Sequence, residues 1–129
     1  MTLARQGLTR NRLLFTICEY MPRKLLTDFE LMILLAILRL DDAYGVSIAR
    51  EIEATAGRKV MLGAVYAALG RLEEQALVTS SLGEPMPQRG GRARQHFRLT
   101  GTGLRAVKDT RRALVALWNN VPQLEGGVG

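Results

Sequence analysis

The sequence predicts a mainly α protein with a small β-hairpin, organised as a winged helix-turn-helix plus a C-terminal dimerisation helix. Apolar residues recur at helical spacing in three successive segments and again in one long segment near the C-terminus. Between them lie two short alternating segments around a loop rich in Gly, Pro and Arg, which is typical of a β-hairpin. Only 5% of the chain is aromatic, so Leu, Ile, Val and Ala have to fill the core, and this favours helices.

The first helix is expected from about Phe29 to Leu40, where nearly every residue is apolar. Thr27 and Glu30 stand three residues apart at the start of this run, which is the spacing of a capping box. We expect a helix that is buried on most of its circumference. Its leucines at helical spacing are Leu31, Leu34, Leu35 and Leu38.

Two further helices are expected to form the helix-turn-helix. The second runs from about Val46 to Ala56 and ends at Gly57, because glycine tolerates the left-handed conformation common after a helix. The third runs over about residues 63–75. Its inward-facing stripe consists of Val65, Leu69 and Leu72, at spacings of four and three.

A hairpin follows these helices. Residues 78–82 and 95–99 are expected to be strands, because the first segment is rich in β-branched and hydroxyl side chains and the second alternates. The loop over residues 83–94 joins them and would form the wing.

The last helix is expected to begin after Thr100 as its N-cap and to extend to about Asn120. It carries the only apolar stripe that the core does not need, and this predicts a partner helix. Arg111 lies within the stripe, where one polar residue can fix the register of paired helices. The predicted dimer and ligand residues are Leu104, Val107, Leu114, Trp118 and Val121.

These elements divide the chain into four parts. Residues 26–99 form the predicted winged helix-turn-helix DNA-binding domain, residues 100–121 the dimerisation helix and residues 122–129 a flexible tail. Residues 1–25 form a basic N-terminal extension. The sequence leaves open whether this extension is a disordered arm, an extra helix or an upstream segment with translation starting at Met21.

The net charge of +6 is unevenly distributed. Residues 1–25 carry five basic side chains and one acidic, a net of +4, and residues 83–98 carry four basic and one acidic, a net of +3. The rest of the chain is therefore close to −1. A near-neutral body with two basic clusters suits a polyanion that contacts one face, although a solvated basic loop would be the default interpretation of either cluster alone.

Several classes of protein are excluded by composition. Cys18 is the single cysteine, so one chain has neither a disulfide framework nor a cysteine metal site. The longest apolar run, residues 31–38, is too short to span a membrane, and no signal-peptide cleavage site is evident. One histidine and no nucleophile with a base leave no candidate active site. We therefore expect a cytoplasmic non-enzyme without metal or cofactor.

Two surfaces are candidates for contact with DNA. The outer face of the third helix is small, which allows its backbone to lie close to a major groove, although such a face could also pack on another helix. The loop of the hairpin is flexible and basic, and its charges can neutralise phosphates. The candidate DNA-binding residues are Gly63, Ala64, Tyr66, Ala67 and Arg71 on the helix, and Arg89, Arg92 and Arg94 in the wing.

Four segments of the chain are distinctive in combination: Leu31–Leu38, Tyr44–Val46, Leu62–Glu73 and Gly90–Thr100. Together they resemble the PadR family of transcription regulators over about residues 26–118, and most of all the members whose C-terminal part is one short helix. The resemblance implies a homodimer, a recognition helix over residues 63–75 and a wing over 83–94. It implies that Tyr66 contacts DNA, and that Trp118 could hold a flat drug-like ligand between subunits.

Three positions depart from the family pattern. The family commonly has glycine where Ala76 stands, threonine where Ala68 stands and a polar residue where Gly70 stands. Base contacts are therefore not transferred from the family to this chain.

The sequence thus predicts a DNA-binding transcriptional regulator, specifically a repressor that binds a palindromic operator as a homodimer and is released by a ligand or signal. Its expected partners are double-stranded DNA, a second copy of the chain and a flat hydrophobic small molecule. The alternative is a winged-helix module that binds protein without sequence-specific DNA binding. The operator, the regulated genes and the effector are not encoded in any pattern that we can interpret.

Overall fold

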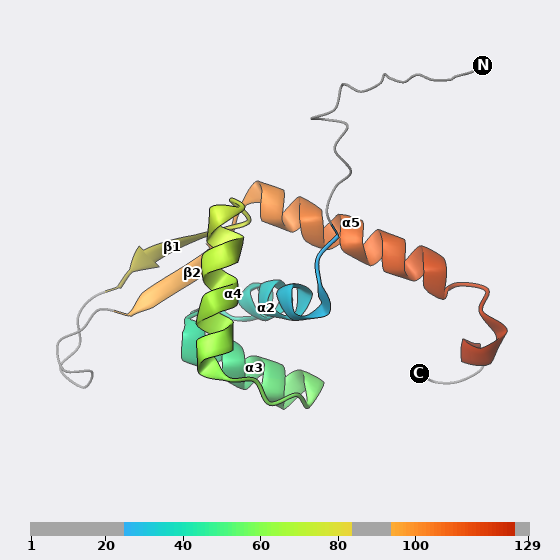
Figure 1. The fold of residues 1–129 in the computed structure, drawn as a ribbon, viewed down its shortest axis with the longest axis horizontal. Helices are drawn as coiled ribbons and strands as arrows, with labels where there is room; N and C mark the ends of the chain where they lie inside the picture. The colour runs from blue at the N-terminus through green and yellow to red at the C-terminus, as the bar shows by residue number, and fades with distance from the viewer. Residues whose placement is uncertain (1–24, 84–93, 126–129) are drawn as a thin grey trace, which may run out of the picture.

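A computed structural model of the chain describes residues 25–83 and 94–125. It confirms the predicted order of three helices, a hairpin and a long helix (Figure 1). Most of the N-terminal extension, Arg89 and Arg92 of the wing, and the end of the tail lie outside the described residues. The elements are α2 (Asp28–Arg39), α3 (Gly45–Ala56), α4 (Leu62–Glu74), β1 (Val78–Leu82), β2 (Gln95–Leu99), α5 (Gly101–Trp118) and the 3-10 helix η2 (Pro122–Leu124).

Three of the predicted helix ends are confirmed by their capping interactions. The hydroxyl of Thr27 accepts a hydrogen bond from the N–H of Glu30 at 3.2 Å, and the Glu30 carboxylate accepts one from the N–H of Thr27 at 2.9 Å. Gly57 ends α3 in the left-handed conformation, with φ of 70°. Thr100 caps α5 by accepting a hydrogen bond from the N–H of Gly103 at 2.9 Å.

The core lies where α2, α3 and α4 cross. The predicted inward stripe of α4 is fully buried there. Helix α2 contacts α3, α4, α5 and β2, and its exposed residues, which include Leu35 and Leu38, lie on the one remaining side. The residues that α2 buries are Glu30, Ile33, Leu34, Ala36 and Ile37.

The hairpin is antiparallel, with Val78 opposite Leu99 and Leu82 opposite Gln95. Its second strand also pairs with the segment that leads into α3. The N–H of Phe97 donates to the carbonyl of Ala43 at 2.8 Å, and Tyr44 forms an isolated bridge with His96. The hairpin is therefore bonded directly to the beginning of the helix-turn-helix.

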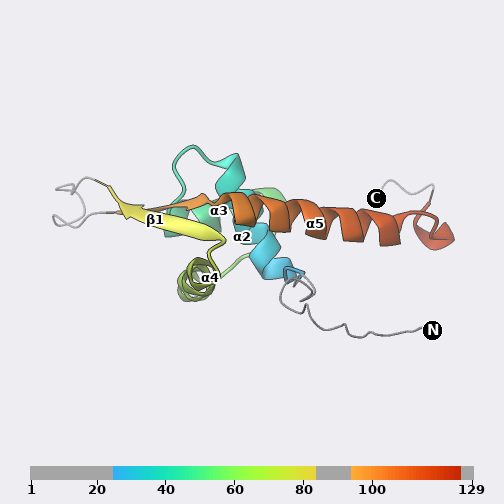
Figure 2. The ribbon, with the colours of Figure 1, turned by 90° about the horizontal axis from the view of Figure 1, so that it is seen from above.

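Helix α5 packs on the body only through its first half, where Gly103, Val107 and Thr110 are buried. Its second half extends beyond the other elements in both views, and Figure 2 shows the hairpin and α5 along one long axis with α4 seen end-on to one side. No helix in the described part of the chain is long and apolar enough to cross a membrane.

Candidate nucleic-acid interface

Helix α4 separates its apolar and small residues onto opposite sides. Val65, Ala68, Leu69 and Leu72 are buried against the core. The five residues predicted on the recognition helix are all exposed and share the other side, because they fall within about half of the helical circumference. These residues are Gly63, Ala64, Tyr66, Ala67 and Arg71.

The N-terminal end of α4 contributes two exposed residues that sequence reasoning missed. Its N-cap is Met61, which provides no side-chain hydrogen bond to the first turn. Met61 is 73% exposed and Leu62 is 41% exposed. The expected start at Gly63 was one residue late because no Ser, Thr, Asp or Asn marks the N-cap. No sequence signal identified them, because the exposure of an apolar side chain follows from the fold.

The ring of Tyr66 packs against the backbone of Gly45. The ring of Tyr66 lies so close to this first residue of α3 that a Cβ at position 45 would be 2.7 Å from Cε2, and closer still to Cζ and the hydroxyl. The ring nevertheless remains 43% exposed. The absence of a side chain at position 45 therefore lets the tyrosine ring pack against the start of α3 while part of the residue stays accessible.

Arg94, at the base of the wing, is also positioned by neighbours. Its guanidinium group lies 3.8 Å from the centre of the Tyr44 ring, a cation–π geometry. Beside it, Nδ1 of His96 lies 2.6 Å from Oδ1 of Asp42. The Tyr44 ring thus positions the Arg94 side chain. Arg89 and Arg92 lie outside the described residues.

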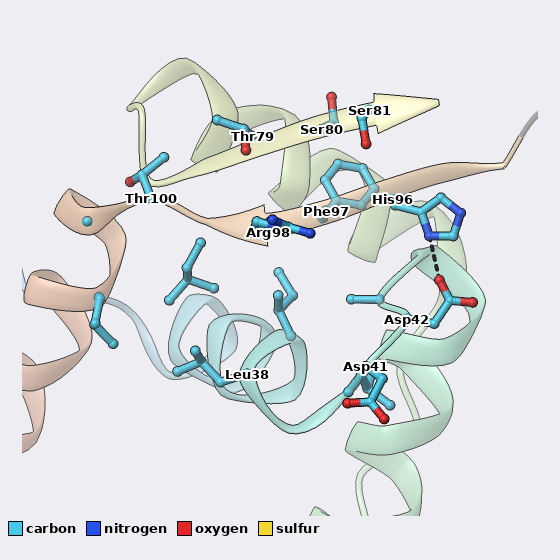
Figure 3. Close-up of a pocket in the computed structure, with 16 residues that line it drawn as sticks. Leu38, Asp41, Asp42, Thr79, Ser80, Ser81, His96, Phe97, Arg98 and Thr100 are labelled. Carbon is cyan, nitrogen blue, oxygen red and sulfur yellow. Dashed lines mark ion pairs between the residues drawn. The ribbon is translucent and has the colours of Figure 1, made fainter. Parts of the chain in front are cut away.

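A groove of about 950 Å³ is lined by exposed residues of the hairpin on one side and by the C-terminal end of α2 on the other. Figure 3 shows Asp42 and His96 facing one another at one end, with Arg98 and Thr79 on the strands above. The Asp41 and Asp42 carboxylates make this hollow a poor site for phosphate. Within the described ranges, no group of three or more His, Cys, Asp or Glu side chains could hold a metal.

The predicted stripe of α5 is divided by the structure. Leu104, Leu114 and Trp118 are exposed, but Val107 is only 7% exposed and belongs to the core of its own chain. The prediction that the core does not need this stripe was therefore wrong for Val107. Val121 lies beyond the last residue of the helix. Sequence reasoning also missed Leu117, which is 75% exposed.

The chain matches the profile of the transcriptional regulator PadR-like family over residues 34–109, which is more than half of its length. It belongs to this family. The matched region includes the helix-turn-helix, the hairpin and the first half of α5. None of the curated proteins compared with the chain is a significant match in sequence.

Solved structures of PadR-like regulators share this fold. A PadR family transcriptional regulator from Eggerthella lenta is 25% identical, with a TM-score of 0.59 over 77% of this chain and 85% of its own. A PadR-like transcriptional regulator from Bacillus cereus is 21% identical, with a TM-score of 0.62 over 77% of this chain and 92% of its own. The winged-helix architecture predicted from the sequence is thereby confirmed.

One family departure has a visible structural consequence. Ala76, which stands where PadR-like chains commonly have glycine, adopts φ of 63°. This left-handed conformation is unfavourable for a residue with a Cβ. The turn between α4 and β1 is nevertheless closed by a hydrogen bond, in which the N–H of Leu77 donates to the carbonyl of Leu72 at 2.9 Å.

Proposed function

We propose that this PadR-like protein is a cytoplasmic transcriptional repressor that binds a palindromic operator in duplex DNA as a homodimer and is released by a ligand or signal. The observation that carries the proposal is the outward side of α4. It is exposed, formed mostly of small residues and not used by the core. Such a helix face can lie close to the bases of a major groove.

Charge supports DNA as the partner of this side. Residues 58–71 contain Arg58, Lys59 and Arg71 and no acidic residue. Arg58 is occupied by Asp28, with 3.3 Å between the charged atoms, so Lys59 and Arg71 are the stronger candidates for phosphate contact. Arg94 would add a contact from the base of the wing, together with Arg89 and Arg92 if the loop reaches the same duplex.

The second half of α5 supports a homodimer. The side of the helix that faces the core at Gly103, Val107 and Thr110 continues past the body to Leu114, Leu117 and Trp118. No described residue covers it there. A mainly apolar stripe that is covered for only half of its length suits a second copy of the same helix.

Trp118 is the proposed contact for a flat hydrophobic effector. It is 62% exposed near the end of α5, where two copies of the helix would enclose it. It is also the single tryptophan of the chain, so its fluorescence would report this site alone. A molecule that quenches Trp118 and lowers DNA affinity would support release by a ligand.

The dependence of DNA affinity on salt tests the proposed function. The full chain would be titrated with operator-sized duplexes over a range of salt concentrations, and log K plotted against log salt. We expect a linear loss of affinity, and a slope that is smaller by about 1 in Arg94→Ala, for the loss of one phosphate contact. Arg105→Ala, an exposed change on α5, is the control and should leave the slope nearly unchanged.

A different result would favour the alternative function. A protein-binding winged helix with a mainly apolar interface would show weak DNA binding without sequence preference. Failure to enrich any sequence from a random duplex library, at low salt and with folded protein, would exclude the repressor.

A further inference from the structure

The leading part of α4 has unusual chemistry for a surface that recognises DNA. From Met61 to Gly70 its exposed side contains a single polar side chain, that of Tyr66. Guanine is most often recognised by arginine or lysine, and adenine by asparagine or glutamine. None of these four residue types occurs in residues 61–70. Side-chain hydrogen bonds to base edges are therefore almost excluded over the first two turns.

Apolar groups at the same end provide another means of recognition. Met61 and Leu62 are both exposed, with Ala64 beside them on the first turn. Together these three residues form an apolar tip on α4. Lys59 lies two residues before the tip and Arg71 more than two helical turns after it, and no carboxylate lies between them in sequence. The tip itself is therefore apolar, and the charged residues nearest to it along this segment are cations.

We infer that the apolar tip of α4 recognises the 5-methyl groups of thymine in the major groove. This methyl is the one apolar group that a base pair of unmodified DNA presents there. The inference rests on the proposed function, because it assumes that α4 enters the groove. It adds that sequence preference arises from methyl contacts of Met61 and Leu62, with Tyr66 and the cations fixing the position of the helix.

Replacement of thymine by deoxyuridine tests this directly, because deoxyuridine keeps every hydrogen-bonding group and lacks only the methyl. Duplexes would first be selected from a random library with the full-length protein. Each thymine of the selected site would then be replaced in turn. We expect one or two positions per half-site at which affinity falls about four-fold, the effect of removing about 0.8 kcal/mol of apolar burial.

Protein variants link the effect to the tip. In Met61→Ala, affinity for the thymine duplex should fall. Replacing thymine by deoxyuridine should then cause little or no further loss of affinity. Leu35→Ala removes an equally apolar, partly exposed side chain from α2 and should leave the deoxyuridine effect unchanged. Because Met61 is largely exposed, its replacement is not expected to unfold the protein, and thermal unfolding would verify this.

The possible failures are distinguishable. If no sequence is enriched, the proposed function fails and this inference fails with it. If a site is selected but no deoxyuridine position changes its affinity, this inference alone is overturned, and specificity comes from DNA shape and backbone contacts instead. A deoxyuridine effect that persists fully in Met61→Ala and in Leu62→Ala would also overturn it.

Discussion

The ring of Tyr66 on α4 occupies the space that a side chain at position 45 would need, so Gly45 at the start of α3 determines where the tyrosine points. The two residues are 21 positions apart in sequence and meet where the helices cross. This contact connects the helix-turn-helix packing to the surface proposed to bind DNA.

Gly45→Ala should therefore weaken DNA binding without unfolding the protein. The new methyl displaces only the end of a partly exposed side chain, which can swing outward at little cost. We expect a loss of about 0.5–1.5 kcal/mol in binding, similar to that of Tyr66→Phe, which removes one hydroxyl contact. The double variant should bind no worse than either single one. Additive losses in a titration of the four proteins would show that the two residues act separately.

Ala76→Gly should stabilise the protein. The left-handed conformation costs an alanine about 1–2 kcal/mol, and the greater freedom of glycine in the unfolded chain offsets about 0.4–1 kcal/mol of that. We expect a net gain of about 0.5–1 kcal/mol in urea unfolding. Ala67→Gly, in the exposed middle of α4, should instead lose about 1 kcal/mol. Equal losses in both variants would contradict the assigned backbone strain.

Gly103→Ala should be strongly destabilising. A Cβ at this position would lie 3.0 Å from the carbonyl carbon of Leu77 and closer still to its oxygen. That oxygen also accepts the N–H of Thr100 at 3.0 Å, so the backbone has little freedom to retreat. We expect a loss of about 1–3 kcal/mol. Gly70→Ala, where a Cβ meets nothing within 4 Å, should gain about 0.5–1 kcal/mol. A tolerated alanine at position 103 would be inconsistent with this packing.

Leu114→Asp should separate the proposed dimer while each chain stays folded. The change places two carboxylates opposite one another across the two-fold axis, and Leu114 is not part of the core. Sedimentation at micromolar concentration should show a monomer, and operator affinity should fall while weak non-specific binding persists. Ala116→Asp adds the same charge on the far side of α5 and should remain dimeric. A monomeric wild-type protein would refute the proposed assembly.

Glu51 should make stability depend on pH. Its carboxylate lies 2.6 Å from Nε of Arg39 and accepts the hydroxyl of Thr55 at 2.8 Å, and these hydrogen bonds lower the pKa of Glu51 in the folded chain. The stabilisation is therefore complete above the pKa of Glu51 in the unfolded chain and is lost as pH falls through the lower folded value. Glu51→Gln should be destabilising at pH 7 and progressively less so in acid.

The control for that experiment is Glu53→Gln, a change to an exposed carboxylate on the same helix. Among the described residues Glu53 forms no ion pair, so this change removes a carboxylate from α3 without breaking a pair such as that of Glu51 with Arg39. A pH-independent effect of Glu51→Gln would show that the Arg39 pair contributes nothing to the folded state.

Local patterns were sufficient to predict the helices and the hairpin. Thr27 with Glu30, Gly57 and Thr100 mark helix ends by interactions within a few residues, so their sequence spacing is informative. The inward stripe of α4 was also predictable, because one side of that helix is apolar and the other is small.

Contacts between distant segments were not predictable in the same way. Periodicity identified the apolar side of α5 but not what covers it, and so Val107 was assigned to a partner although its own core encloses it. The seat of Tyr66 on Gly45 depends on the angle at which two helices cross. Met61 lacked any capping pattern, and its exposure emerged only from the fold.

The bond between Phe97 and Ala43, together with the bridge between Tyr44 and His96, has a consequence for how operators can vary. It joins the hairpin to the beginning of α3, so the base of the hairpin and the helix-turn-helix of one protomer would contact a proposed half-site together. In the proposed dimer, the distance between the two α4 helices would then be set by the α5 pairing. Half-sites one DNA turn apart, about 34 Å, require that distance to be held. A small change in the angle at which two α5 helices cross would therefore alter the distance between the two α4 helices, and the two could no longer contact both half-sites at the same time.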